Sequence, residues 1–198
     1  MTNASDRLED KQWQASDPKI LLETPVGEII SSELISSRTG IKKQFYRFNF
    51  PAWVNIVACT PKNEIVLIEQ YRFGTGRTEL EIPGGAVEKD ESIIKAGLRE
   101  LFEETGYVGE RAQIIGRVVP NPALQDNFCY TVLVENAIKN GTPCLDDMED
   151  IRTILLPEKE VFNLIVQGRI YHGLVLNGLM FYQLQRQQGL IRLDSQPE

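Results

Sequence analysis

The sequence predicts an α+β domain that carries an N-terminal appendage. Three observations support this class. The chain has 198 residues with 42% hydrophobic and 25% charged side chains, it contains many short strand-like runs, and three segments have helical spacing. A chain of this length and composition can bury a core, which excludes a largely disordered or fibrous protein.

The predicted strands are runs of β-branched and aromatic residues that turn residues separate. They span residues 27–37, 43–50, 53–60, 64–70, 79–82, 113–120, 129–135 and 151–156. The turn at 61–63 predicts that the strands 53–60 and 64–70 form a hairpin. Residues 83–85 read Pro-Gly-Gly and predict a loop with a permissive backbone.

Helical patterns span residues 90–105, 158–167 and 174–187. In the first of them, Asp90 is the expected N-cap and Gly106 the expected stop. One face of this helix should pack on a sheet, because four apolar residues recur there at helical spacing: Ile94, Leu98, Leu101 and Phe102. The polar residues 1–18 predict a loose arm.

Charge and cysteine content restrict the function classes. The formal net charge is −7, so the basic excess of a nucleic-acid-binding protein is missing. Three cysteines without a CxxC pair suit a reduced compartment better than a disulfide scaffold. No signal peptide or membrane span is recognisable. We therefore expect a cytoplasmic protein that binds neither nucleic acid nor membrane.

Three acidic residues of the first helix fall together at positions i, i+3 and i+4. These residues, Glu100, Glu103 and Glu104, repel one another at this spacing. A divalent cation such as Mg²⁺ or Mn²⁺ would offset the repulsion, and Arg99 can brace one carboxylate. The alternative is a solvated acidic face, which is the commoner meaning of a charge run.

The run from residue 85 to 107, GAVEKDESIIKAGLRELFEETGY, resembles the Nudix box, G-x5-E-x7-R-E-U-x-E-E-x-G-U, where U is aliphatic. The matching positions are Gly85, Glu91, Arg99, Glu100, Leu101, Glu103, Glu104 and Gly106, and only Tyr107 departs. The stretches IVLIEQYR (65–72) and EIPGG (81–85) are similar to the ADP-ribose and nucleoside-diphosphate-sugar pyrophosphatases of this superfamily. The residues after Asn121-Pro122 differ from the ADP-ribose pattern, which leaves the sugar and the base open.

The resemblance implies a Nudix fold, an α/β/α sandwich with a mixed sheet plus N-terminal antiparallel strands. Residues 1–50 would form the arm and a dimer-building strand pair, and residues 51–198 the hydrolase domain. The implied protein is a homodimer. The implied reaction is Mg²⁺-dependent hydrolysis of a nucleotide sugar of the ADP-ribose or GDP-mannose type, with a nucleoside monophosphate and a sugar phosphate as products.

The resemblance also implies site residues. The metal ligands would be Glu100 and Glu104, with Glu103 assisting and the Gly84 carbonyl as a further ligand. The general base would be an acid of the loop before the last strand, Glu149 first and Asp147 second, with Glu103 as a further catalytic candidate. Substrate would be bound by Arg72, Arg47 and Glu81.

Two rival functions remain open: hydrolysis of nucleoside triphosphates or dinucleoside polyphosphates on the same fold, and a sensor that binds a nucleotide sugar without turnover. His172 is the only histidine. We expect it to be a loop residue without a catalytic role, because there is no second histidine with which to build a ligand set.

Overall fold

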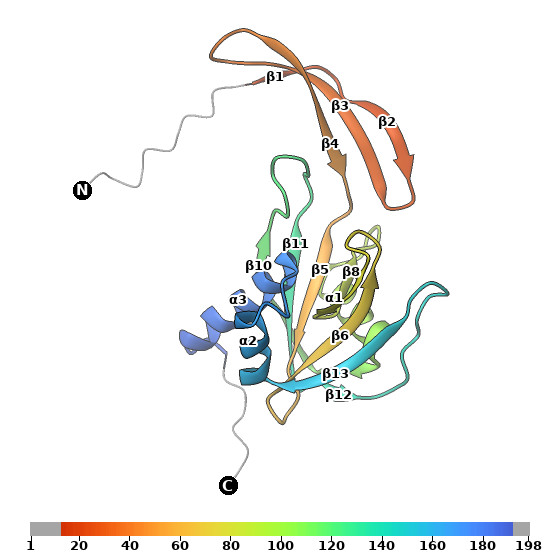
Figure 1. Cartoon of the computed structure of the whole chain (residues 1–198), viewed down its shortest axis with the longest axis vertical. Helices are drawn as coiled ribbons and strands as arrows, with labels where there is room; N and C mark the ends of the chain where they lie inside the picture. Colours follow the sequence, from red (N-terminus) through yellow and green to blue (C-terminus); the bar gives the residue numbers. More distant parts are fainter. Residues whose placement is uncertain (1–12, 192–198) are drawn as a thin grey trace, which may run out of the picture. The chain divides into compact units, whose positions relative to one another are not determined.

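The structure is a computed structural model in which residues 13–191 are described. The chain divides into two compact units. Unit 1 contains Met1–Phe50 and Asn121–Asp126, and unit 2 contains Pro51–Pro120 and Asn127–Glu198. Each unit has its own sheets (Figure 1). Among the described residues, no helix has both the length and the apolar character needed to span a membrane.

Unit 1 is an antiparallel sheet built around one long strand. Its strands are β1 (Gln14–Ala15), β2 (Lys19–Thr24), β3 (Gly27–Ile35) and β4 (Lys42–Asn49). Strand β3 pairs with the other three. The two strands predicted here are confirmed. The prediction of a loose arm is wrong for β1, which pairs with β3. Strand β2 was not predicted, and it pairs along the same edge of β3. Residues 1–12 of the predicted arm lie outside the described residues.

Unit 2 contains two larger sheets and a short strand pair. The first sheet has the order β10 (Arg111–Val118), β11 (Cys129–Glu135), β5 (Trp53–Ala58) and β8 (Gly84–Ala86). It is mixed, since β11 and β5 run parallel and the other pairs antiparallel. The second has the order β13 (Ile151–Pro157), β6 (Glu64–Arg72) and β7 (Arg77–Glu81). The short pair is β9 (Tyr107–Val108) with β12 (Ile138–Lys139).

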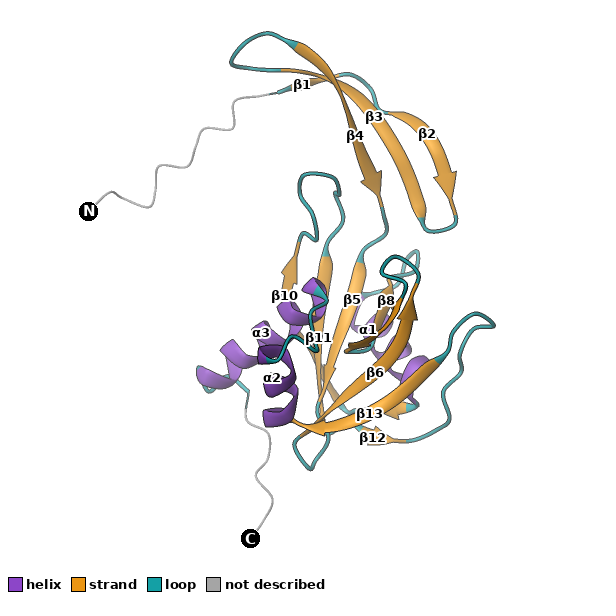
Figure 2. Ribbon diagram, in the orientation of Figure 1, coloured by secondary structure: helices purple, strands orange, loops and turns teal. Residues whose placement is uncertain are grey.

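The three helices of unit 2 cover the two faces of these sheets (Figure 2). They are α1 (Ile93–Thr105), α2 (Glu158–Val166) and α3 (Gly173–Gln187). Because strand residues alternate between faces, Ile56 of β5 packs in a cluster with Leu101 of α1. Its neighbour Val57 joins the opposite cluster with Tyr182 of α3. The predicted α+β class and α/β/α sandwich with a mixed sheet are therefore confirmed.

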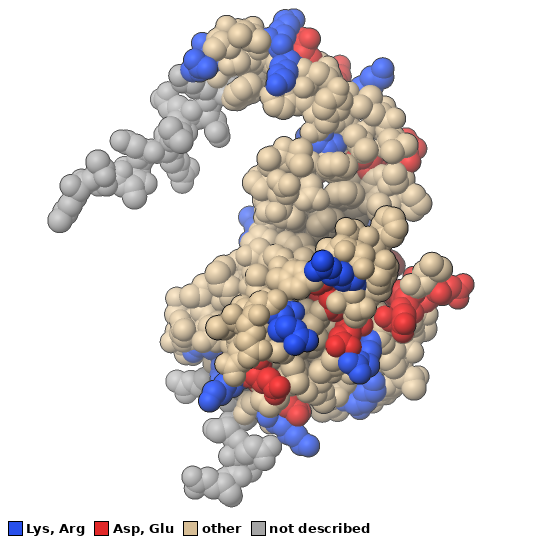
Figure 3. All heavy atoms as spheres, viewed as in Figure 1, with Lys and Arg blue, Asp and Glu red and all other residues tan. Residues whose placement is uncertain are grey.

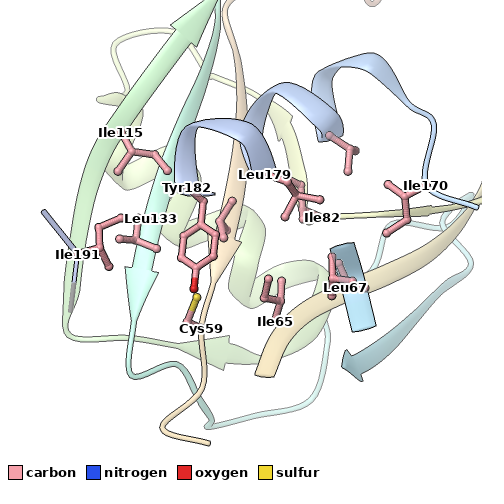
Figure 4. Packing of buried hydrophobic residues seen from close by; sticks show 13 residues of the cluster. Cys59, Ile65, Leu67, Ile82, Ile115, Leu133, Ile170, Leu179, Tyr182 and Ile191 are labelled. Carbon is pink, nitrogen blue, oxygen red and sulfur yellow. The ribbon is translucent and has the colours of Figure 1, made fainter. Parts of the chain in front are cut away.

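Figure 4 shows the core under α2 and α3, where Tyr182 points its hydroxyl toward the sulfur of Cys59. Both side chains are fully buried. Burial raises the pKa of the Cys59 thiol to about 12, so the thiol stays protonated and packs as a small apolar group.

The predicted hairpin of residues 53–60 and 64–70 is wrong. Within the described residues, Cys59, which follows β5, forms one isolated antiparallel bridge with Ile65 of β6, and the two strands then diverge into different sheets. Strand β5 lies between β11 and β8, and β6 lies between β13 and β7. With both edges of each strand already paired, no ladder between them can form.

The start of the first helix also differs from the expectation. Ser92 is the N-cap of α1, because its hydroxyl accepts a hydrogen bond from the Lys95 backbone N–H. Asp90 adopts a positive φ of 65° in the preceding turn. The predicted stop is confirmed, since Gly106 is the left-handed C-cap at φ 69°. The predicted Pro-Gly-Gly loop continues as strand β8, which pairs with β5.

Candidate active site

A cavity of about 590 Å³ lies in unit 2, a size typical of small-molecule sites. Its walls come from the start of β5, the end of β6, strands β7 and β8, and the segment that leads into α3. The residues that matter below are Trp53, Arg72, Glu79, Glu81, Gly84 and His172.

Glycines allow strand β8 to pass between β5 and helix α1. A Cβ atom at Gly84 would lie 2.5 Å from the carbonyl oxygen of Val54, and one at Gly85 would lie too close to Glu100. The backbone N–H of Gly84 donates a hydrogen bond of 3.0 Å to Glu104 Oε2. Gly84 and Gly85 also line the cavity, so the carboxylates of α1 lie directly beside it.

The acidic residues of α1 do not form a uniformly solvated face, since the Glu100 side chain is 14% exposed and that of Glu103 is 40% exposed. Glu104 is 3% exposed. Burial raises the pKa of the Glu104 carboxyl to about 8, and the charges of Glu100 and Glu149 act in the same direction. The Gly84 N–H and the charge of Arg72 oppose this shift. Burial is also the main cause that raises the pKa of Glu100.

Arg99 braces three carboxylates, where the sequence predicted one. Its guanidinium donates to Glu91, to Glu100 Oε1 at 2.9 Å and to Glu103 Oε2 at 2.9 Å. It also donates to the carbonyl oxygen of Ala86 at 3.0 Å, which ties α1 to β8. In the described part of the chain, no three Asp, Glu, His or Cys side chains form a preassembled metal-ligand group.

A divalent cation nevertheless fits the donors beside β8. Glu104 and Glu100 are carboxylates whose pKa burial raises although Arg72 and Arg99, respectively, oppose the shift. Such oxygens are the ligands that Mg²⁺ prefers. Glu103 is partly exposed and turned to Arg99.

Glu81 binds two cavity residues through one buried carboxylate. Arg72 Nε and Nη2 donate to its two oxygens at 2.9 Å each, and His172 Nδ1 lies 3.1 Å from Oε2. Burial alone would raise the pKa of Glu81, but the contacts with His172 and Arg72 lower it to about 2. Glu81 is therefore ionised at neutral pH.

The neighbouring inward residue of β7 makes a similar contact. Glu79 is buried and accepts a hydrogen bond of 2.7 Å from the Thr75 hydroxyl. A hydrogen bond with Glu79 is the main cause that raises the pKa of Tyr171. Since residues two apart on a strand face the same way, both glutamates contribute to one wall of the cavity.

The loop acids differ in their relation to this site. The Glu149 charge acts on Glu100, Glu104 and Arg72. Its carboxylate accepts a hydrogen bond of 3.0 Å from the Asp146 N–H, which closes the loop ahead of β13. Asp147 is exposed, and its charge is not among the main influences on those three groups.

Arg47 belongs to unit 1, where Nε lies 3.5 Å from Asp126 Oδ2. The residues that line the cavity all come from unit 2. Arg47 is therefore the one predicted site residue that is placed in the other unit.

Sequence reasoning missed His172, which lines the cavity and contacts a carboxylate 91 positions earlier in the chain. Its place just before a predicted helix was visible in the sequence. Its partner was not, because the contact depends on α3 packing against the sheet. The Asn55 amide helps to hold that packing, since Nδ2 donates to the carbonyl oxygen of Leu174 at 2.9 Å.

Comparisons with known proteins agree with this site. Residues 50–172 match a family model described as NUDIX domain. A Bacillus methanolicus protein named methanol dehydrogenase activator is 32% identical over 154 residues, which are 77% of this chain and 82% of the relative. A Bacillus subtilis (strain 168) protein named ADP-ribose pyrophosphatase is 27% identical over 136 residues, 68% of this chain and 74% of the relative. A crystal structure of an ADP compounds hydrolase has a TM-score of 0.79 over 91% of this chain and 97% of that chain. At 19% identity this likeness shows the fold alone.

Proposed function

The chain belongs to the NUDIX domain family as a pyrophosphohydrolase, and we propose that it is a cytoplasmic, Mg²⁺-dependent enzyme that cleaves the diphosphate of a nucleotide sugar. The products would be a nucleoside monophosphate and a sugar phosphate. The observation that carries this proposal is the pair of carboxylates formed by the buried Glu104 and the largely covered Glu100, which lie against Gly84 and Gly85 of a cavity that Arg72 also lines.

The metal-binding residues we propose are Glu100, Glu104 and the Gly84 carbonyl, with Glu103 assisting. Bound Mg²⁺, or Mn²⁺ in its place, would neutralise phosphate charge and make a bound water more acidic. Arg99 has a separate role, since it holds the acids of α1 close to β8 through Glu91 and Ala86.

Glu149 is the residue we propose as general base. It accepts the proton of the attacking water, for which a carboxylate near the reacting phosphorus is needed. Glu149 is favoured over Asp147 because its charge acts on Glu100, Glu104 and Arg72. Glu103 is less suited, since its carboxylate is already bound by Arg99.

Arg72 is the residue that we propose binds the substrate diphosphate. A guanidinium is a strong phosphate ligand, and Glu81 fixes its orientation through two hydrogen bonds. Glu81 therefore affects substrate binding by orienting Arg72. This support favours a diphosphate substrate, of which ADP-ribose and a hexose conjugate such as GDP-mannose are the two candidates.

A homodimer is the proposed assembly, with Arg47 reaching the site of the partner. The described part of unit 1 exposes apolar side chains on strands β2 and β4, among them Ile20, Leu22, Phe45 and Tyr46. Much of its face in Figure 3 is uncharged, whereas on unit 2 acidic and basic side chains are interleaved. Such an apolar surface is typical of an interface.

We expect analytical ultracentrifugation to give twice the 22.5 kDa chain mass. Replacing Leu22 with Lys should shift the protein toward the monomer. The matched control is Leu190→Lys, an exposed leucine of unit 2, which should leave the dimer intact. A wild-type mass of one chain would contradict the dimer.

A panel of substrates tests the proposed reaction. We expect Mg²⁺-dependent release of a nucleoside monophosphate from ADP-ribose or a hexose conjugate, with much slower turnover of nucleoside triphosphates and dinucleoside polyphosphates. The name of the Bacillus subtilis relative makes ADP-ribose the first compound to test. Preference for a triphosphate would support the first rival function. Tight binding without turnover of any diphosphate would support the sensor.

A further inference from the structure

The part of the cavity wall formed by the end of β6, strand β7 and the segment before α3 contains a three-residue contact. Glu81 is 2% exposed, and its carboxylate holds Arg72 from the end of β6 and His172 from the residue before α3. Arg72 and His172 also line the cavity. Because both side chains contact one carboxylate, their free ends lie on the same part of the cavity wall.

In both Arg72 and His172, one edge of the side chain faces Glu81, and a nitrogen on another edge can contact a ligand. Nδ1 of His172 is buried and lies 3.1 Å from Glu81 Oε2 without forming a well-aligned hydrogen bond, while the side chain as a whole is 40% exposed. The exposure therefore lies on the rest of the ring, where Nε2 is. For Arg72, Nε and Nη2 face Glu81, and Nη1 is not part of that pair.

A helix-capping role does not account for the His172 side chain. His172 is the N-cap residue of α3, but its side chain makes no capping hydrogen bond. The first turn of α3 is held by Asn55, which donates to Leu174. The imidazole is turned toward Glu81 and the cavity instead.

We propose that His172 is a substrate-binding residue that forms a phosphate clamp with Arg72, and that Glu81 is the positioning residue for both. The two ring nitrogens of a histidine point in different directions, so one ring can face the Glu81 carboxylate with Nδ1 and donate to a phosphate oxygen from Nε2. This inference rests on the proposed function, because it assigns the clamp to the diphosphate of that substrate.

Two substitutions of His172 distinguish a contact with the substrate phosphate from a role in packing. His172→Asn keeps a donor near Nδ1 and removes the nitrogen turned to the cavity. His172→Gln keeps a donor near Nε2 and loses the one that faces Glu81. The kinetic readout is KM and kcat for ADP-ribose with Mg²⁺. The binding readout is the affinity for ADP without added metal, measured by calorimetry, which does not require turnover.

If His172 is part of the phosphate clamp, His172→Asn should raise KM about tenfold and weaken ADP binding by a similar factor, since one charge-assisted hydrogen bond to phosphate is lost. His172→Gln should change both by about threefold or less. The two variants should have similar melting temperatures.

The opposite result would overturn the clamp. In that result, His172→Asn has near-normal KM and ADP affinity, whereas His172→Gln melts at a lower temperature and binds ADP weakly. Equal effects of the two variants, or no ADP binding by the wild type, would also overturn it. If no nucleotide sugar is hydrolysed but His172→Asn alone weakens ADP binding, the proposed function fails and the clamp stands.

Discussion

Replacing Glu104 with glutamine should lower turnover about a thousandfold or more and, in the metal-free protein, raise the melting temperature. The loss of turnover follows because a charged oxygen of the proposed metal site is removed while the shape is kept. Glutamine can still accept the hydrogen bond from Gly84 N–H. The gain in stability follows because the glutamine side chain has no charge that must be buried.

The stabilisation of the metal-free protein by Glu104→Gln should increase with pH. Burial raises the pKa of Glu104 from 4.5 to about 8 in the folded protein. A carboxyl group with a raised pKa destabilises the folded state above its unfolded pKa and has no effect below it, where both states are protonated. The stabilisation by Glu104→Gln should therefore be absent near pH 4, grow to on the order of 3 kcal/mol at pH 7 and level off above pH 8.

Thermal unfolding in EDTA at several pH values measures this effect, and Glu103→Gln is the matched control. Glu103 is 40% exposed and paired with Arg99, so its replacement should bring no comparable stabilisation. Added Mg²⁺ should raise the melting temperature of the wild type but hardly that of Glu104→Gln, because a bound ligand stabilises only the state that holds it. Near-normal turnover of Glu104→Gln would refute the metal assignment.

Replacing Glu149 with glutamine should reduce kcat about a hundredfold or more, whereas Asp147→Asn should change it by less than about threefold. General-base catalysis typically contributes about 10²–10⁴-fold. Glutamine can still accept the hydrogen bond from the Asp146 N–H, so the loop should keep its conformation. Asp147 serves as the matched control because it is exposed on the same loop.

The measurement is kcat across pH at saturating substrate and Mg²⁺. If neither variant slows the reaction more than about tenfold, the base is not on this loop.

The local features of the site could be predicted because short-range rules determine them. The spacing of Glu100, Glu103 and Glu104 puts them on one side of α1 wherever the helix packs. Gly106 ends α1 as expected because the left-handed conformation suits glycine. Strand β11 also has the predicted bounds, 129–135.

Other features depended on which elements meet. The hairpin prediction failed because β5 and β6 found partners on both edges in separate sheets, and no turn sequence reports that choice. The N-cap shifted from Asp90 to Ser92 because the preceding turn uses a positive φ at Asp90. When two candidate N-cap residues lie two positions apart, the backbone conformation before the helix decides which of them is the N-cap.

By itself, the order of residues determined the family and the helix that carries the acids, because each depends on neighbours within a few turns or on a spaced motif. The tertiary structure alone decided that Glu104 is buried and that His172 meets Arg72 on one carboxylate. The physical reason is that burial and ionic contacts come from packing between segments far apart in the chain, and helical or strand periodicity carries no information about the partner.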